Sequence, residues 1–432
     1  MDFKQYPSYE DSGVEWLGEV PEHWNLKRFC YLFAENKKKN IGLKETNVLS
    51  LSYGNIKEKK IDDNKGLLPE SFETYQIIEP NDIVFRFTDL QNDKRSLRSA
   101  ISKYHGIITS AYIAVKTKQN ADFYNYLFRA YDLQKVFYSM GEGMRQSLKM
   151  DELNKMPVVL PSEDEQKRIV SFLDTETIRI DNLISKQEKL IELLEEQRKS
   201  IISHAVTKGL NPNAPMKDSG VEWLGDVPEH WNLKPIKFLA KTNQLTLAEN
   251  TDENYEIQYV DIGSVSRTNG IEKIETILFK DAPSRARRIV KDGDIIVSTV
   301  RTYLKAIAYI ENPPKNLIVS TGFAVLNPIR TVIFPQYAKF TFLAEQFIAE
   351  VIAKSKGISY PAITATELAD IKIALPPLNE QKVILQYLLE ENLKMNKLIS
   401  KQNQLIEKLK EYRASIISHA VTGKIDVREF GA

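Results

Sequence analysis

The chain has 432 residues, of which 42% are hydrophobic and 27% are charged, and its formal net charge is +1 at pH 7. This length exceeds what one ordinary hydrophobic core covers, so it predicts two or more domains. The small net charge excludes a protein that coats DNA through a uniformly basic surface, but it leaves open a DNA-binding protein with segregated charge.

The sequence also predicts a cytoplasmic protein without a membrane span. No window approaches 18 uncharged apolar residues, and the first residues lack the basic start and apolar run of a signal peptide. Cys30 is the single cysteine, so neither a disulfide framework nor a cysteine zinc site is predicted.

The first motif along the chain, DSGVEWLGEVPEHWNLK at residues 11–27, returns at residues 218–234 with 16 of its 17 residues unchanged. The octapeptide SIISHAVT occurs at residues 200–207 and again at 415–422. We call these repeated segments the frame, and the two long, weakly similar stretches between them the inserts. A constant frame around two variable inserts predicts one architecture, built twice, that presents two surfaces for two different targets.

The first insert shows a mixed α and β pattern. Short apolar runs such as 107–108 and 113–115 predict strands, and residues 123–140 predict a helix. The polar stretch 86–98 predicts an exposed loop whose residue types match the edges of DNA bases. With a second, glycine-bearing loop at 141–147, it supplies the candidate DNA-contacting residues Arg86, Asp89, Gln91, Lys94, Arg95, Arg98 and Arg145.

An apolar run that ends at Pro161 closes the first insert, and a long helix follows it. The acids Glu163, Asp164 and Glu165 suit the first turn of a helix. Apolar residues then recur at the a and d positions of a coiled coil, with Gln187 as a polar position that could fix the register. The predicted seam is Leu173, Ile180, Leu183, Gln187, Leu190, Leu194 and Ile201.

Gly209, Pro212 and Pro215 predict a linker, after which the second copy repeats the order of elements. Its candidate DNA-contacting residues lie in two loops, 298–305 and 355–360, and are Arg301, Thr302, Tyr303, Lys305, Lys356 and Tyr360. A helix is predicted at residues 337–354. The predicted seam of its long helix is Leu388, Met395, Leu398, Gln402, Leu405, Leu409 and Ile416.

The fold class predicted from these patterns is α+β: two mixed α/β domains, separated by two long helices that form an antiparallel coiled coil, with a pseudo-two-fold internal duplication. The predicted boundaries are 1–160 for the first domain, 161–207 for the first long helix, 208–217 for the linker, 218–376 for the second domain, 377–422 for the second long helix and 423–432 for a C-terminal tail.

Catalytic motifs do not emerge from the sequence. It contains no phosphate loop, no dinucleotide fingerprint, no HExxH and no paired CxxC. Four of the five histidines lie in the frame and are interpreted as structural or interface residues. The four tryptophans also lie in the frame, where they fit either a core staple or a partner-docking surface. Taken singly, the candidate loop residues also fit ordinary solvated loops.

The repeated frame resembles the specificity subunit of Type I restriction–modification systems. Three features carry the resemblance, each present twice: SGVEWLGxVPEHW, a Leu-Pro junction before Glu-Gln-Lys, and a heptad helix that ends in ISHAVT. The resemblance covers essentially the whole chain. It implies that each insert is a target-recognition domain for one half of a split sequence in double-stranded DNA, and that the frame helices space the two domains.

The resemblance further implies a subunit without catalytic activity, metal or cofactor of its own. Two modification subunits would bring S-adenosylmethionine and methylate adenine, and two restriction subunits would bind ATP and Mg, translocate and cut. Two alternatives remain from the residues alone: a non-catalytic coiled-coil adaptor that displays two protein-binding domains, and a self-contained nuclease or methyltransferase, which the missing motifs disfavour.

Overall fold

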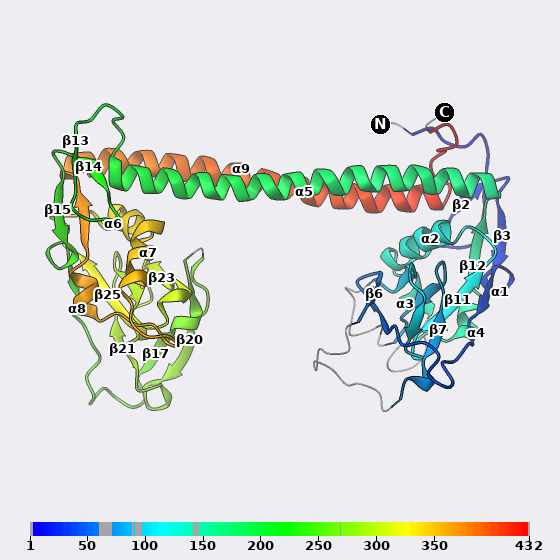
Figure 1. Ribbon diagram of the computed structural model, residues 1–432, viewed down its shortest axis with the longest axis horizontal. Helices are drawn as coiled ribbons and strands as arrows, with labels where there is room; N and C mark the ends of the chain where they lie inside the picture. The colour runs from blue at the N-terminus through cyan, green and yellow to red at the C-terminus, as the bar shows by residue number, and fades with distance from the viewer. Residues whose placement is uncertain are drawn as a thin grey trace. The chain divides into compact units, whose positions relative to one another are not determined.

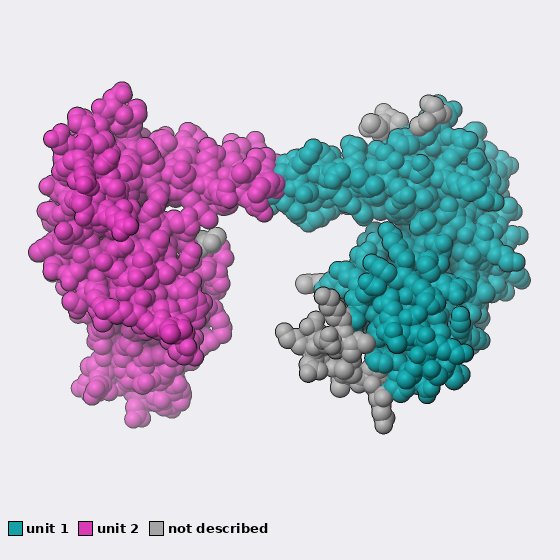
Figure 2. Space-filling model, viewed as in Figure 1, with its two compact units in different colours: residues 1–188, 403–432 teal, residues 189–402 magenta. Residues whose placement is uncertain are grey.

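The structure is a computed structural model, and it describes residues 3–59, 71–88, 90, 97–140, 147–267 and 269–430. The chain forms two compact units, which we call unit 1 (residues 1–188 and 403–432) and unit 2 (residues 189–402) (Figure 2). Each unit contains one insert, one copy of the frame motif and part of both long helices, α5 (Glu163–Lys208) and α9 (Leu378–Val421) (Figure 1).

Unit 1 is built around a four-stranded antiparallel sheet with the strand order β4-β11-β8-β9. Before α5, its elements are β1 (Tyr9–Asp11), β2 (Glu19–Pro21), β3 (Asn25–Arg28), α1 (Phe29–Leu32), β4 (Phe33–Glu35), β5 (Leu49–Ser52), β6 (Asn55–Glu58), η1 (Phe72–Thr74), β7 (Gln76–Ile78), β8 (Ile83–Phe85), β9 (Ser99–Ile101), β10 (Gly106–Ile108), β11 (Ile113–Thr117), α2 (Ala121–Leu133), α3 (Val136–Met140), α4 (Met150–Leu153) and β12 (Pro157–Leu160).

Unit 2 contains a sheet of the same kind, with the order β16-β25-β22-β23. Its elements between the long helices are β13 (Met216–Asp218), β14 (Asp226–Pro228), β15 (Asn232–Pro235), η2 (Ile236–Phe238), β16 (Ala240–Thr242), β17 (Glu256–Val260), η3 (Ile262–Ser264), β18 (Val265–Ser266), β19 (Gly270–Ile271), β20 (Glu275–Leu278), η4 (Phe279–Asp281), β21 (Ala286–Ile289), β22 (Ile295–Ser298), η5 (Thr302–Leu304), β23 (Ile307–Tyr309), β24 (Leu317–Ser320), β25 (Phe323–Pro328), α6 (Pro335–Phe342), α7 (Glu345–Lys354), α8 (Ala365–Ala369) and β26 (Lys372–Leu375).

Both four-stranded sheets are covered on both faces, which explains their continuous apolar strands. In β22, Ile295 and Val297 pack in the cluster that contains α6 and α7, whereas Ile296 packs in a second cluster with strand β24. In β8, Ile83 and Phe85 pack with α2, whereas Val84 faces the other way. Successive side chains of a strand point to opposite faces, so a strand buried on both sides needs an apolar residue at every position.

The second layer is where the two inserts differ. In unit 2 it is a four-stranded sheet, β20-β17-β24-β21, in which β17 and β24 run parallel. Among the described residues of unit 1, the corresponding part of the insert forms two pairs, β5–β6 and β7–β10, and a parallel bridge joins Val48 to Ile107. The layer next to the helices is therefore shared, and the outer layer has diverged.

Each insert is closed by an antiparallel strand pair between the frame and the end of the insert. In unit 1, β3 pairs with β12 from Asn25↔Leu160 to Arg28↔Pro157. In unit 2, β15 pairs with β26 from Asn232↔Leu375 to Pro235↔Lys372. The two ends of each insert thus lie side by side, held by backbone hydrogen bonds that depend little on side-chain identity.

Within each unit, α5 and α9 pack against each other in opposite directions (Figure 1). In unit 1, Arg168 donates to the carbonyl of Arg428, and further along α5 Asp181 accepts two hydrogen bonds from Arg413 (2.8 and 3.2 Å). In unit 2, Arg198 donates to Asn396 (2.6 Å). Leu173 and Ile180 share a core cluster with Ile416. The contacts of Asp181 with Arg413 and of Arg198 with Asn396 join the two helices and specify their register within each unit, whereas Arg428 belongs to the segment after α9.

Three residues of the predicted seam are more exposed than an interior position allows, so the structure does not support their place in the seam. Leu190, Leu398 and Leu405 are 38%, 42% and 41% exposed. Each belongs to a Leu-Ile dipeptide, and the isoleucine next to it takes the inward position: Ile406, for example, is 5% exposed. Spacings of three and four residues both fit a helix with 3.6 residues per turn, so the sequence could not separate adjacent apolar residues. Gln187 and Gln402 are half-buried.

The two shorter predicted helices are each broken in two. Residues 123–140 form α2 and α3, with Lys135 between them at a positive φ of 64°. Residues 337–354 fall in α6 and α7, and Ala344, at the junction, has an extended backbone. Apolar periodicity continued across both breaks, which is why a single helix was expected.

We predict that Gly423→Ala lowers the free energy of unfolding by about 3 kcal/mol, through left-handed strain and overpacking together. Gly423 has φ +74°, and an added Cβ would lie 2.6 Å from Cγ of Pro21. The control is Gly13→Ala, at φ +67° with nothing within 4 Å, which should cost only about 1 kcal/mol of strain. Urea unfolding measures both, and equal losses would contradict the packing at the end of α9.

Candidate nucleic-acid interface

Two loops of the second insert that are far apart in sequence form one surface. The first loop links β22 to β23 and contains η5; the second links α7 to α8. Val300 and Ala362 form an antiparallel bridge between them, and the amide of Ile363 donates to the carbonyl of Thr299 (2.9 Å). The structure therefore brings together the two loops that were singled out in this half of the sequence.

This surface presents cations and aromatic rings to solvent. Arg301, Tyr303, Lys305, Lys356 and Tyr360 are all exposed. The guanidinium of Arg301 lies 5.1 Å from the centre of the Tyr360 ring, within reach of a cation–π interaction. Arg301 and Lys305 both have left-handed backbones (φ 51° and 53°), a strained conformation for these residue types that often accompanies function.

Thr302 does not belong to the exposed set, and this corrects the sequence-based prediction. Its side chain is 3% exposed, and its hydroxyl is hydrogen-bonded to the hydroxyl of Ser355 (2.9 Å). Ser355 in turn donates to the carbonyl of Val351 in α7 (2.7 Å). Thr302 therefore connects η5 to the end of α7 through Ser355. The alternation of polar residues in this loop could not reveal that one of them faces inward.

Arg98 is a second correction. Its side chain is fully buried, and it donates to the carbonyl of Thr88 (3.2 Å) and lies over the ring of Tyr138. Its backbone amide donates to the buried carboxylate of Asp132 (2.8 Å), and burial raises the pKa of that carboxyl. Arg98 is therefore a buried structural residue of the first insert. The polar run around it suggested a wholly exposed loop, whereas the chain turns inward here.

The remaining candidates of the first insert are mostly outside the described residues. Arg86 is half-buried, and its backbone amide pairs with the carbonyl of Arg98 (2.8 Å). The candidates that lie outside the described residues are Asp89, Gln91, Lys94, Arg95 and Arg145.

Sequence reasoning missed the exposed apolar residues of the second-insert surface. Ile358, Leu304 and Val300 are exposed beside the cations. An isoleucine between glycine and serine, in the run 355–361, was the available signal. In the basic cluster at 285–288, Arg285 donates to the hydroxyl of Tyr259 (3.3 Å) and Arg287 lies over the ring of Phe279, so both contact other parts of the insert.

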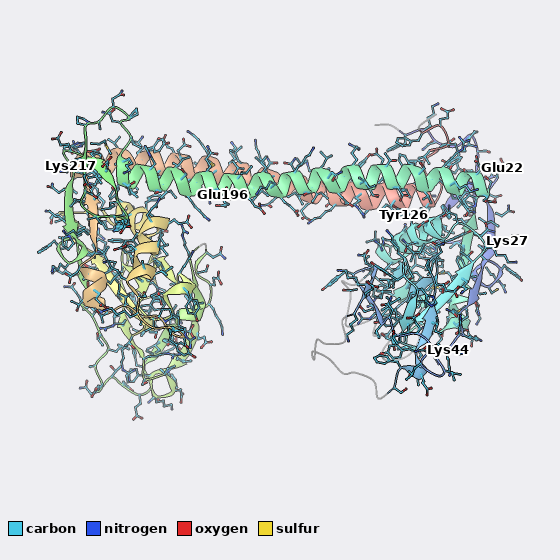
Figure 3. All side chains as sticks on the ribbon, viewed as in Figure 1. Glu22, Lys27, Lys44, Tyr126, Glu196 and Lys217 are labelled. Carbon is cyan, nitrogen blue, oxygen red and sulfur yellow. The ribbon has the colours of Figure 1, made fainter. Side chains whose placement is uncertain are left out.

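The frame forms a second pair of candidate sites, one in each unit. In unit 2, a cleft of about 790 Å³ is lined by Trp223, Ser203, His204 and Thr207; Glu196 of α5, labelled in Figure 3, also lines it. In unit 1, a cleft of about 590 Å³ is lined by the corresponding Trp16, Ser418, His419 and Thr422. The other two tryptophans, Trp24 and Trp231, are buried in the cores. We call these the frame clefts.

At the end of each long helix, next to its frame cleft, a lysine side chain binds backbone carbonyls of the frame. Lysine and glycine stand there in opposite order in the two copies. The first copy reads Lys208-Gly209, whereas the second reads Gly423-Lys424. The ammonium of Lys208 nevertheless donates to the carbonyls of Leu224 and Asp226, and that of Lys424 to the carbonyl of Glu19, the counterpart of Asp226. The contact is thus retained in space.

The start of each long helix is fixed by a Glu-Gln pair. Gln166 is fully buried; it accepts from the amide of Asn120 (3.1 Å) and donates to the carbonyl of Pro161 (2.9 Å). The carboxylate of Glu165 contacts the ring of His23 (3.1 Å). In unit 2, Gln381 and Glu380 repeat these contacts, with Glu380 bound to His230 (2.7 Å) and Trp231.

Comparison with known proteins accounts for the frame. The family described as "Type I restriction modification DNA specificity domain" matches residues 100–195 and 228–408, more than half of the chain. The chain belongs to this family. DNA sequence specificity within a type I restriction–modification system is accordingly its role, as the frame predicted.

Two archaeal relatives from Methanocaldococcus jannaschii illustrate the similarity. The putative type I restriction enzyme MjaX specificity subunit is 25% identical over 436 residues, covering 95% of this chain and 96% of the relative. The MjaVIII specificity subunit is 26% identical over 341 residues, covering 75% of each chain.

Solved structures share the fold. A chain from the structure described as "Structural basis underlying complex assembly and conformational transition of the type I R-M system" matches with a TM-score of 0.64 and 16% identity, over 93% of this chain and 98% of that one. The HsdS subunit from Thermoanaerobacter tengcongensis matches with a TM-score of 0.53 and 15% identity, over 94% and 98%. The mixed α+β architecture with long helices is therefore that of specificity subunits.

Across the described ranges, none of the helices combines the length and apolar character needed to cross a bilayer. Within the same residues, no group of three or more His, Cys, Asp or Glu side chains is arranged to hold a metal ion.

We predict that Arg98→Ala lowers the free energy of unfolding by about 2–4 kcal/mol, because it empties buried space and removes the hydrogen bond to the carbonyl of Thr88. Arg301→Ala, on the exposed surface, should change it by less than about 0.5 kcal/mol. Urea denaturation of the two variants gives both values. If Arg98→Ala were neutral, the interior position of this guanidinium would be wrong.

Proposed function

We propose that each insert reads one half of a bipartite target in double-stranded DNA. The observation that carries the proposal is the combination of a shared sheet, closed by the same frame strands, with different outer layers and loops. A common scaffold with different loops suits two readers of the same ligand class with different sequence preferences. The exposed cations of the second insert supply contacts to phosphates, and its polar side chains can reach base edges.

The long helices would keep the two readers at a fixed separation. We infer a continuous antiparallel coiled coil with pseudo-two-fold symmetry, supported by the opposite directions of α5 and α9 within each unit. Helices of 46 and 44 residues are roughly 65–70 Å long at about 1.5 Å per residue. That length exceeds the separation of half-sites one helical turn apart, about 34–36 Å.

We further propose that the chain is a recognition subunit without catalytic activity or cofactor of its own. Methylation and cleavage would reside in partners: two modification subunits that bind S-adenosylmethionine and two restriction subunits that bind ATP and Mg. The cytoplasm, where chromosomal DNA lies, is the proposed location. The family membership supports these assignments, and the paired frame clefts support the presence of two identical partners.

Exchange of one insert tests the reading of half-sites. Residues 29–156, between β3 and β12, are replaced by the corresponding insert of a relative, and the chain is expressed with its modification subunit. We expect methylome sequencing to show one half of the methylated motif replaced and the other half retained, because the strand pair β3–β12 closes the insert independently of its contents.

The matched control exchanges residues 236–371 between β15 and β26, which should change only the other half. A change in both halves after either exchange would contradict the assignment of one half-site to each insert. Methylation that does not depend on sequence at all would contradict the proposed function.

The frame clefts are predicted to dock the two modification subunits. His204 and His419 are exposed in equivalent positions. A glutamate at either position should put an uncompensated charge in one interface and weaken one subunit's binding by at least about tenfold. Native mass spectrometry should then show one bound modification subunit for His204→Glu or His419→Glu, and none for the double variant.

Tyr31→Glu, at a 75% exposed position in α1, serves as the control and should retain both subunits. Two bound modification subunits in the double variant would place their docking surface elsewhere on the chain.

A further inference from the structure

The second-insert surface carries the most exposed large apolar side chain among the described residues. Ile358 is fully exposed at the tip of the loop 356–362, and Tyr360, on the same loop, is 65% exposed. Tyr303 and Leu304 of the neighbouring loop are also exposed. Single exposed apolar residues are common, but several on two adjoining loops of a recognition surface indicate contact with an apolar partner surface.

Backbone hydrogen bonds fix the base of this loop, and they hold Ile358 in an exposed position at its tip. Lys356 and Ala362 exchange two backbone hydrogen bonds (2.8 and 2.9 Å). The amide of Thr302 donates to the carbonyl of Pro361 (3.4 Å), which joins the tip to η5. Gly357 permits the tight turn, since it has φ +109° and an added Cβ would lie 3.2 Å from the carbonyl oxygen of Tyr360.

Positive charge flanks the apolar tip. Arg301 stacks on Tyr360, Lys305 is exposed, and Lys356 donates to Glu367 (2.9 Å). Hydrogen bonds from the amide of Thr364 and from Lys356 hold the pKa of Glu367 down at about 2, so this carboxylate is ionised and offsets one of the three cations. An apolar tip between cations complements a partner that is anionic outside and apolar inside.

Duplex DNA has this construction, with phosphates outside and stacked bases within. We propose that Ile358 is a wedge that enters the base stack of the second half-site and unstacks one step, while Arg301 and Lys305 hold the phosphates beside it. The proposal rests on the function proposed above, in which the second insert binds duplex DNA. Isoleucine is among the side chains that proteins insert between base steps, and the deformation is least costly at pyrimidine–purine steps.

The alternative contact for an exposed isoleucine is a thymine methyl group in an undistorted major groove. The two differ in whether bases unstack. A wedge would also make the methylated motif depend on a step that no polar side chain reads, because deformability enters the binding energy.

The test uses the full-length chain in complex with its modification subunit and duplexes that contain its methylated motif. Each duplex carries one 2-aminopurine, whose fluorescence rises on unstacking, at a position of the second half-site other than the methylated adenine. We expect one position to brighten by at least about threefold on binding of the wild type. Ile358→Ser should abolish this rise and weaken binding by no more than about tenfold. Ile358→Leu should retain the fluorescence rise and the affinity of the wild type.

Ile274→Ser, which changes a half-exposed isoleucine before β20, is the control and should behave as the wild type. Specific binding by the wild type without any brightening, or brightening that survives in Ile358→Ser, overturns the wedge and leaves the proposed function standing. Absence of sequence-specific binding by the wild type overturns the proposed function itself. Binding of the wild type, but not of Ile358→Ser, to anionic lipid vesicles would assign the tip to a membrane surface instead.

Discussion

The first turn of each long helix is the constraint on which the rest of the structure depends. There, one buried glutamine is hydrogen-bonded both to the Leu-Pro junction before the helix and to the backbone where a helix of the insert begins. The glutamate before it reaches the histidine of the frame motif. Because a buried amide must have its hydrogen bonds satisfied, these contacts fix the direction in which each long helix leaves its unit.

This constraint also explains where variation is tolerated. The partners of Gln166 and Gln381 in the inserts are mainly backbone groups, which almost every residue type supplies, although Gln166 also donates to the side chain of Gln119 (3.3 Å). The strand pairs β3–β12 and β15–β26 likewise use the backbone. An insert can therefore change most of its side chains and keep its attachment. Divergence has accumulated in the layer away from the helices, and in the loops that carry Arg301 and Ile358.

The sequence predicted the features that depend on repetition and periodicity: the two frames, the long helices and the strand-like runs of the inserts. It did not predict which side of a helix or loop faces inward. In three Leu-Ile dipeptides of the long helices, both residues fit the seam by spacing, and the leucine is the more exposed of the two. Arg98 and Thr302 have the composition of surface residues, yet both side chains are buried, where they bond to the carbonyl of Thr88 and the hydroxyl of Ser355. Ile358 was overlooked because composition directs attention to charge, whereas its exposure is a property of a turn.

The exchanged order of lysine and glycine after the two SIISHAVT segments bears on how such a chain can tolerate small changes in length. A helix that gains one residue turns everything beyond it by about 100°, since a turn has about 3.6 residues. Here α5 ends at Lys208, and α9 ends at Val421, two residues earlier relative to the repeat. The four-carbon side chains of Lys208 and Lys424 span the difference and reach corresponding carbonyls. A long, flexible side chain at a helix end can therefore keep the same contact when the helix ends one or two residues earlier or later. The resulting rotation of the backbone is compensated by the lysine side chain and does not displace the frame segment that it contacts.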